Sequence, residues 1–236
     1  MKATRNEINT IPALVWGEPS DKVLLCVHGK MGFKECVEGI AEIAQEKGYQ
    51  TISFDLPQHG ERKDEVERCD IWNGIRDLTL VGDYVFSRWK EVSLYACSLG
   101  AYFSLHAYPK REFKQCLFQS PILDMEYLIG QMMLWFDVSE ERLCREQEVN
   151  TPIDVLSWNY FQYVKDHPVS KWNIPTCILY AGKDNLQSRD VVTDFASRFG
   201  CSLTVSEQSE HPFMDEGDGP VVERWLRENL SRKMKG

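Results

Sequence analysis

The sequence lacks three features that would assign it to a special class of protein. It has no apolar run long enough to cross a membrane, and residues 1–19 (MKATRNEINTIPALVWGEP) lack the apolar centre of a signal peptide. It also lacks a basic excess, since 27 Lys and Arg face 36 Asp and Glu and the formal net charge is −9. Nucleic acids and anionic membranes bind basic surfaces, so we expect neither as a partner.

The cysteines show neither a metal-binding nor a disulfide pattern. All eight lie far apart along the chain, and no two of them form a CxxC pair. Several fall inside apolar segments, where Cys behaves as a small hydrophobic residue. We therefore expect no metal site, and we expect a reduced protein located in the cytoplasm.

What the sequence does contain is a regular alternation of strand-like and helix-like segments. Apolar runs that stop at Gly, Pro or Asp suit parallel strands covered on both faces, and they lie within residues 21–29, 49–57, 91–97, 114–121 and 175–184. Residues 201–209 fit a last strand, and residues 11–19 fit an edge strand or hairpin arm. Helical spacing of apolar residues recurs in 37–44, 71–89, 191–199 and 222–230. This alternation predicts an α/β protein with a mostly parallel, doubly wound sheet.

One long segment interrupts the alternation. Residues 122–173 are typical of helices, and they are more numerous than a single crossover between strands requires. Within them, TPIDVLSWNYFQYVKDHP (151–168) predicts a helix that begins at its Thr-Pro pair and stops before Pro168. We predict a core made of residues 1–121 and 174–236, with residues 122–173 inserted as a small helical cap.

A serine stands where the pattern changes most abruptly. VSLYAC (92–97) is strand-like, Ser98 follows, and helical spacing begins at once, with Ala96 and Gly100 two positions to either side. A strand that turns into a helix at a serine is the arrangement of a nucleophile elbow, whose usual pattern is G-x-S-x-G. Here Ala96 replaces the first glycine but keeps the small size that packing requires. The alternative is an ordinary strand–helix turn that needs small residues.

A serine nucleophile needs a general base, and His211 is the best placed of the five histidines. Its segment follows the last predicted strand, and ligands of such sheets lie beyond the carboxyl ends of the strands. Asp184 also follows a strand and could orient the imidazole, whereas Asp124, after the preceding strand, is the second candidate. Asp190 fits the first turn of the next helix.

Backbone N–H groups close to the serine would stabilise negative charge on a substrate oxygen. The segment CVHGKMG (26–32) follows the first strong strand, so its donors lie near the elbow. The N–H groups of Lys30 and Leu99 are the candidates for this oxyanion hole. For His28 we expect a structural role within its loop.

Together these segments resemble the α/β-hydrolase superfamily. The motifs HGKMG, FDLPQHGER, ACSLG, AGKDN and SEHPF occur in the order of that family between residues 28 and 213. The resemblance implies a catalytic triad of Ser98, Asp184 and His211, with Lys30 and Leu99 as oxyanion donors. It further implies that the inserted segment is a lid over the pocket, that His59 is structural, and that neither a metal nor a cofactor takes part.

The fold alone does not select a substrate. Met and aromatic residues are dense in the inserted segment and predict an apolar pocket lined by Met132, Trp135, Phe136 and Trp158, although the same side chains would suit a dimer contact. We expect a serine hydrolase that acts through an acyl-enzyme on a small to medium carboxylic ester or thioester. The alternatives are a serine peptidase or amidase, and a ligand-binding protein without turnover. We expect the side chain of Lys30 to point to solvent; if it reaches the pocket instead, an anionic substrate group becomes possible.

Overall fold

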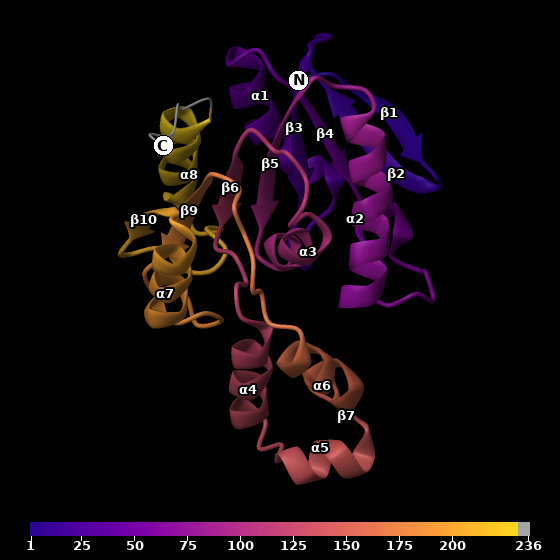
Figure 1. Ribbon diagram of the computed structural model, residues 1–236, viewed down its shortest axis with the longest axis vertical. Coiled ribbons are helices and arrows are strands. Elements are labelled where there is room, and N and C mark those ends of the chain that lie inside the picture. The colour runs from indigo at the N-terminus through magenta and orange to yellow at the C-terminus, as the bar shows by residue number, and fades with distance from the viewer. Residues whose placement is uncertain (231–236) are drawn as a thin grey trace.

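An eight-stranded sheet forms the centre of the structure, a computed structural model that describes residues 1–230 (Figure 1). The strands lie in the order β1-β2-β4-β3-β5-β6-β9-β10. Their bounds are β1 Ala3–Ile8, β2 Ile11–Trp16, β3 Lys22–Val27, β4 Gln50–Phe54, β5 Glu91–Cys97, β6 Cys116–Gln119, β9 Thr176–Ala181 and β10 Ser202–Ser206. In the part of this order that runs from β4 through β3, β5, β6 and β9 to β10, neighbouring strands pair in parallel. The β1–β2 hairpin at one edge is antiparallel. The expected mostly parallel sheet is therefore confirmed.

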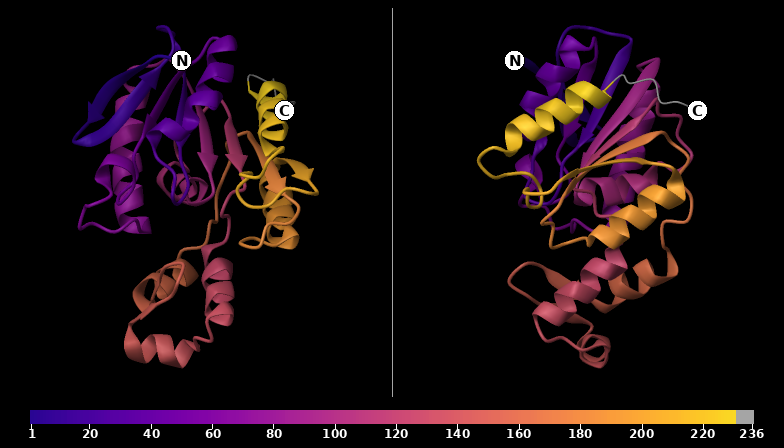
Figure 2. Two further views of the ribbon diagram at one scale, coloured as in Figure 1. Left: turned by 180° about the vertical axis from the view of Figure 1, so that it is seen from behind. Right: turned by 90° about the vertical axis from the view of Figure 1, so that its left-hand side faces the viewer.

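Helices cover both faces of this sheet (Figure 2). One face packs against α1 (Glu38–Glu46) and α8 (Asp218–Asn229), and the other against α2 (Ile71–Phe86), α3 (Leu99–Ala107) and α7 (Arg189–Phe199). Among residues 1–230, no helix combines the length and hydrophobicity needed to span a membrane.

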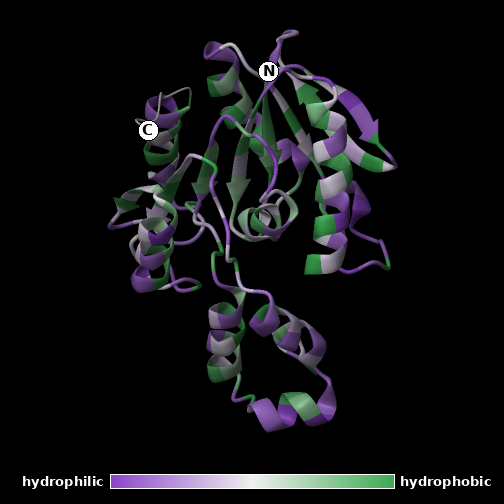
Figure 3. Cartoon of the chain, viewed as in Figure 1, coloured by the Kyte–Doolittle hydropathy of each residue, from purple (hydrophilic) through white to green (hydrophobic). Residues whose placement is uncertain are grey.

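Strand β3 shows why the sheet needs cover on both sides. Leu24 and Cys26 belong to the core beneath α1 and α8, whereas Val23, Leu25 and Val27 belong to the core beneath α2 and α3. Successive side chains of a strand point to opposite faces, so a continuous apolar run supplies two cores at once. The central strands are accordingly largely green in Figure 3.

Between β6 and β9 the chain leaves the sheet and forms a separate layer. This segment contains α4 (Met125–Trp135), α5 (Glu140–Glu146), β7 (Glu148–Asn150), β8 (Val155–Ser157) and α6 (Trp158–Asp166). Figure 1 shows the arrowheads of β5 and β6 pointing toward it. The segment therefore lies beyond the carboxyl ends of the parallel strands.

The predicted helix start at residue 151 is wrong. Strands β7 and β8 form an antiparallel ribbon, in which Val149 is paired with Leu156 and both are buried. The hydroxyl of Thr151 accepts from the N–H of Asp154 at 3.1 Å and closes the turn of this ribbon instead of capping a helix. Helix α6 begins later, where Ser157 accepts from the N–H of Tyr160.

A buried ion pair joins the loops that follow β3 and β4. The carboxylate of Asp55, which is fully buried, accepts from Lys34 N at 2.8 Å, from Lys34 Nζ at 2.9 Å and from Glu61 N at 3.0 Å. Burial by itself lowers the pKa of Lys34, but its bonds to Glu61 and Asp55 outweigh this and raise the pKa above its ordinary value. Gly60 has φ of +54°, and a Cβ there would lie 2.2 Å from Asp55 Oδ1, so the turn requires glycine.

A second buried pair fixes the same loop to α2. Nη1 of Arg62 donates to Asp77 Oδ2 at 2.7 Å and to the main-chain oxygen of Asp55 at 2.9 Å. Both side chains of the Arg62–Asp77 pair are at most 6% exposed. These contacts fix the loop after β4, which in turn supports the loop after β3.

Replacing Asp77 with Ala should destabilise the protein strongly. The change removes the buried carboxylate that binds Nη1 of Arg62 and leaves the guanidinium with the more exposed Glu65 at its Nε. This should cost about 3 kcal/mol of unfolding free energy, the lower end of the range for breaking a buried pair. Asp83 provides a matched control on the same helix, because its pair with Arg111 leaves its side chain 61% exposed. Asp83→Ala should cost less than about 1 kcal/mol. Urea unfolding of both variants measures the difference, and equal losses would contradict the role of the buried pair.

Candidate active site

The turn between β5 and α3 places Ser98 in a strained conformation. Its φ of 50° and ψ of −118° are unusual for a residue other than glycine. Hydrogen bonds to three other residues hold this backbone in place, besides a longer one from Tyr102 N to Ser98 O at 3.4 Å. Ser98 N donates to Gln119 O at 3.1 Å, and Ser98 O accepts from Ala101 N at 3.0 Å and from Ile122 N at 3.1 Å. The side chain is thereby displayed at the corner of the strand–helix turn.

Close packing explains the small residues around this turn. A Cβ at Gly100 would lie 2.4 Å from His28 O and 2.7 Å from Val27 O, so α3 can start against the end of β3 only with glycine there. A Cβ at Gly29 would lie 2.9 Å from the Cβ of Ser98. The predicted elbow and the predicted His-Gly loop therefore depend on each other sterically.

The structure brings Ser98, His211 and Asp184 together. Ser98 Oγ lies 2.8 Å from His211 Nε2, and His211 Nδ1 lies 2.8 Å from Asp184 Oδ2. An ionised carboxylate only accepts hydrogen bonds, so Nδ1 carries the proton and Nε2 accepts from the serine hydroxyl. The side chains of His211 and Asp184 are 9% and 1% exposed, which shields this chain of hydrogen bonds from water.

The acid is anchored by its second oxygen. Asp184 Oδ1 accepts from the N–H groups of Leu186 at 2.8 Å and Gln187 at 3.2 Å, which leaves Oδ2 for the imidazole. The second candidate, Asp124, lies elsewhere and caps α4 by accepting from Tyr127 N at 2.8 Å. Asp190 lies in the first turn of α7, as expected. Of these three acids, only Asp184 is therefore in contact with His211.

Lys30 and Leu99, the two predicted oxyanion donors, lie beside one cavity. Leu99 is the first residue of α3, so its N–H has no helical carbonyl to reach. The N–H of Lys30 makes none of the backbone hydrogen bonds found in the loops of residues 1–230. Both residues line the same cavity, described below. Free N–H groups in this arrangement are suited to bind an oxygen that gains negative charge.

Two histidines hold the loop that carries Lys30. His28 Nε2 accepts from Leu56 N at 3.0 Å, and its Nδ1 bonds to Gly29 O at 2.8 Å. Burial lowers the pKa of His28 to about 4, so the ring stays neutral and can accept. His59 Nε2 accepts from Met31 N at 3.0 Å, the residue next to Lys30. Both histidines are structural, in line with the expectation from the sequence.

A cavity of about 480 Å³ opens beside Lys30 and Leu99. Its walls come from the loops after β3 and β4, from the start of α2 and from the β8–α6 junction. Trp72 and Tyr160 form an aromatic part of the wall, with ring centroids 5.8 Å apart. This volume falls within the usual range for small-molecule sites.

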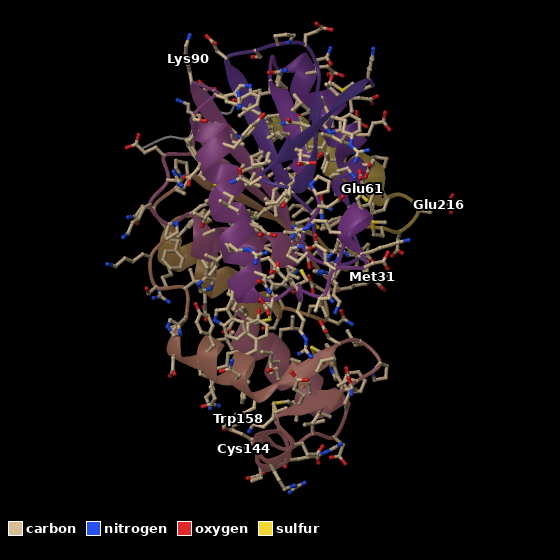
Figure 4. The ribbon with its side chains drawn as sticks, turned by 90° about the vertical axis from the view of Figure 1, so that its right-hand side faces the viewer. Met31, Glu61, Lys90, Cys144, Trp158 and Glu216 are labelled. Atoms are coloured by element: carbon tan, nitrogen blue, oxygen red, sulfur yellow. The ribbon has the colours of Figure 1, made fainter. Side chains whose placement is uncertain are left out.

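The four residues predicted for the pocket do not line this cavity; its walls lack Met132, Trp135, Phe136 and Trp158. Met132 packs into the main core, Trp135 is 40% exposed, and Trp158 contacts the ring of Phe161. Figure 4 shows Trp158 in the α4–α6 segment, apart from Met31 in the loop after β3. An apolar helical stripe serves packing as well as binding, so the sequence did not identify the face that meets the site. Trp72 and Tyr160 gave no signal beyond their aromatic character.

The cations beside the cavity are paired with acids of the β7–β8 ribbon. Lys30 Nζ donates to the carboxylate of Asp154 and to Ile153 O at 3.1 Å, so the expectation that this side chain engages only solvent is wrong. Arg68 makes a bidentate salt bridge with Glu148, with Nη1 2.6 Å from Oε1 and Nη2 3.1 Å from Oε2. These ion pairs tie the core loops to the ribbon. They also neutralise both cations of the cavity, which disfavours an anionic ligand.

Comparison with known proteins gives similarity in three dimensions only. No family model and no curated protein match the sequence. The solved structure of Est1E from Butyrivibrio proteoclasticus, with ferulic acid bound, superposes with a TM-score of 0.78 at 18% identity, covering 96% of this chain and 97% of that one. Mouse alpha/beta hydrolase domain-containing protein 10 gives 0.75 at 14% identity, covering 97% and 98%. The thioesterase domain from the curacin biosynthetic pathway gives 0.64 at 15% identity, covering 96% and 98%.

The neutral state of His28 predicts how stability depends on pH. Its pKa is about 4 in the folded chain and 6.5 when unperturbed, so the unfolded chain binds the extra proton first as the pH falls. The contribution of His28 to the free energy of unfolding should therefore be fully present above pH 6.5 and decline below that pH. At pH 5 the loss from His28 should be about 2 kcal/mol.

His106 contributes with the same sign, because burial also lowers its pKa to about 4. Urea unfolding at pH 7 and pH 5 of the wild type and of His106→Phe separates the two contributions. The variant should lose about half as much stability as the wild type between these pH values. A variant that loses as much as the wild type would contradict the assignment to His106, and one that loses nothing would contradict the assignment to His28.

Proposed function

The chain has the α/β-hydrolase fold, and we propose that it is a serine hydrolase acting on a small to medium carboxylic ester or thioester. The observation that carries the proposal is the pair of 2.8 Å contacts from Ser98 through His211 to Asp184. A base within hydrogen-bond reach of a hydroxyl, itself oriented by a carboxylate, is the arrangement that activates a serine. The free N–H groups of Lys30 and Leu99 support the same conclusion.

The proposed reaction has two halves that use the same groups. In the first half, Ser98 Oγ attacks the acyl carbon, and its proton passes to His211 Nε2. Asp184 stabilises the imidazolium, while Lys30 N and Leu99 N bind the developing oxyanion. Collapse of this intermediate breaks the bond to the leaving alcohol or thiol, which takes the proton from His211. In the second half, water attacks the acyl-enzyme by the same route and releases the acid.

The cavity beside the donors supports an uncharged, partly aromatic substrate. Trp72 and Tyr160 offer flat apolar surface, and the cations of Lys30 and Arg68 are already paired. We propose that residues 122–173 act as a lid, because Asp154, Val155 and Ser157 of this segment line the cavity. The esterase and thioesterase named among the similar structures are consistent with this substrate class.

We propose a reducing compartment, the cytoplasm, as the location. Cys26, Cys69, Cys97 and Cys116 are among the cysteines that form no disulfide in the described structure. Burial raises the pKa of Cys97, which precedes Ser98, to about 12, so its thiol stays protonated and unreactive. Protonated thiols outside disulfides, such as that of Cys97, suit a reducing environment.

A fluorophosphonate probe tests the proposed nucleophile. The wild type should be labelled at Ser98, and Ser98→Ala should lose both labelling and hydrolysis of p-nitrophenyl esters by at least about a thousandfold. Ser104→Ala is the control, because this buried hydroxyl on the same helix bonds only to Gly100 O at 2.7 Å. An unlabelled wild type would favour the ligand-binding alternative. Faster cleavage of aminoacyl amides than of esters would favour the peptidase alternative.

The acid is tested by two substitutions to asparagine. Asp184→Asn should lower kcat by about 10³–10⁴, because the amide can no longer hold the required tautomer of His211. Asp124→Asn should leave kcat close to that of the wild type, since Asn caps a helix as well as Asp does. Steady-state kinetics on one p-nitrophenyl ester measure both. The reverse order of effects would assign the role to Asp124.

A further inference from the structure

Gln119 bonds to Ser98 and to Pro212, the residue next to His211, although it takes no part in the proposed reaction. It is the last residue of β6 and only 7% exposed. Its main-chain oxygen accepts from Ser98 N at 3.1 Å. Its side-chain Nε2 donates to the oxygen of Pro212 at 2.8 Å, and Pro212 directly follows His211. A single residue thus bonds to the nucleophile and to the neighbour of the base.

The chemistry of its partners fixes the orientation of the Gln119 amide. A carbonyl oxygen only accepts, so the NH₂ group must face Pro212 and Oε1 must face the other way. There, Oε1 accepts from the hydroxyl of Tyr95 at 2.7 Å. Tyr95 is 3% exposed, and burial raises its pKa well above the ordinary value, so it remains a protonated donor. The chain Tyr95–Gln119–Pro212 leaves none of these polar atoms unpaired.

The segment that carries His211 needs such an anchor. It runs from β10, at the edge of the sheet, to α8 without regular secondary structure. Its start is fixed at Ser209, whose oxygen accepts from Lys183 N at 3.0 Å and whose hydroxyl donates to Asp218 at 2.6 Å. His211 itself contacts Ser98 and Asp184. Among the other hydrogen bonds described for residues 1–230, the bond from Gln119 is the one that joins residues 210–213 to a central strand. A central strand is rigid, so this bond can set where the imidazole stands.

We propose that Gln119 is a positioning residue, which sets the distance and angle between His211 Nε2 and Ser98 Oγ while Tyr95 holds its amide in register. The proposal rests on the proposed function, because it assigns Gln119 a part in the work of that same pair. Gln119 acts through Pro212 and touches no reacting atom. A displacement of about 1 Å at a catalytic group lowers the rate by about a hundredfold, so a bond that fixes the position of His211 should have a large effect on the rate.

The test compares Gln119, the last residue of β6, with Gln115, which directly precedes β6. Gln119→Met keeps the length of the side chain and removes its hydrogen bonds. Gln115→Met is the matched control, because Gln115 is 4% exposed and its Nε2 donates to Asn229 O at 3.1 Å. Its main-chain oxygen accepts from Leu94 N, much as that of Gln119 accepts from Ser98 N. Gln119→Met should lower Tm more than Gln115→Met, because it removes the side-chain hydrogen bonds to both Tyr95 and Pro212, whereas the control removes the one to Asn229. Both variants are therefore assayed well below either Tm, where each is fully folded, so that stability does not explain a difference in rate.

Gln119→Met should lower kcat on a p-nitrophenyl ester by about 10- to 100-fold and leave KM within about threefold. Gln115→Met should leave kcat within about twofold of the wild type. Tyr95→Phe should lower kcat less than Gln119→Met does, and the double variant should be no slower than Gln119→Met alone, because the two residues act in one chain. Equal values of kcat for the two methionine variants would overturn the proposal.

A second readout does not depend on turnover. The ¹H and ¹⁵N signals of the His211 ring should move in Gln119→Met and stay in place in Gln115→Met. Unchanged signals in Gln119→Met would overturn the positioning role even if the enzyme were active. A wild type that hydrolyses no ester would instead defeat the proposed function, and the ring signals would still decide whether Gln119 positions His211.

Discussion

The strained backbone of Ser98 is the constraint on which the rest of the site depends. A positive φ at a residue with a side chain persists only where the surroundings enforce it. Here β5 leads into the turn, α3 leads out of it, and Gln119 and Ile122 hold its backbone on the side of β6. Because α3 starts against the end of β3, Gly100 leaves no room for even one methyl group. The strain and the tight packing therefore exist together, and together they place one hydroxyl at the corner of the turn, 2.8 Å from His211 Nε2.

Parallel topology then explains how distant residues meet. Lys30, Ser98, Asp184 and His211 each follow a strand whose carboxyl end lies at the same edge of the sheet. Loops at such an edge are free to vary, so each needs its own support. The Asp55–Lys34 pair and His59 support the loop of Lys30. Backbone N–H groups hold Asp184, and Gln119 reaches the segment of His211. The groups of the proposed active site are thus held by neighbours that take no part in the proposed reaction.

The segment between β6 and β9 adds the outer wall of the site by different means. Its contacts with the core loops include two exposed ion pairs, Lys30–Asp154 and Arg68–Glu148, and each such pair contributes little free energy. Buried apolar residues of the segment, Met132 and Phe161 among them, also belong to the core cluster that lies beneath α2 and α3. The segment is therefore joined to the core by apolar packing as well as by ion pairs.

The sequence by itself determined the order of the parallel strands and of the helices between them, the sharp strand–helix turn at Ser98 and the loop residues that reach the common edge. These features follow from hydrophobic period and from the small size that a sharp turn demands, both of which are local properties of the chain. Only the tertiary structure decided that Asp184 and not Asp124 meets His211, that Trp72 and Tyr160 line the cavity, and that Gln119 holds Pro212. It also replaced part of a predicted helix by the β7–β8 ribbon. Each of these depends on contacts between segments far apart in the chain, and a local pattern does not encode which of several suitable side chains will face a given neighbour.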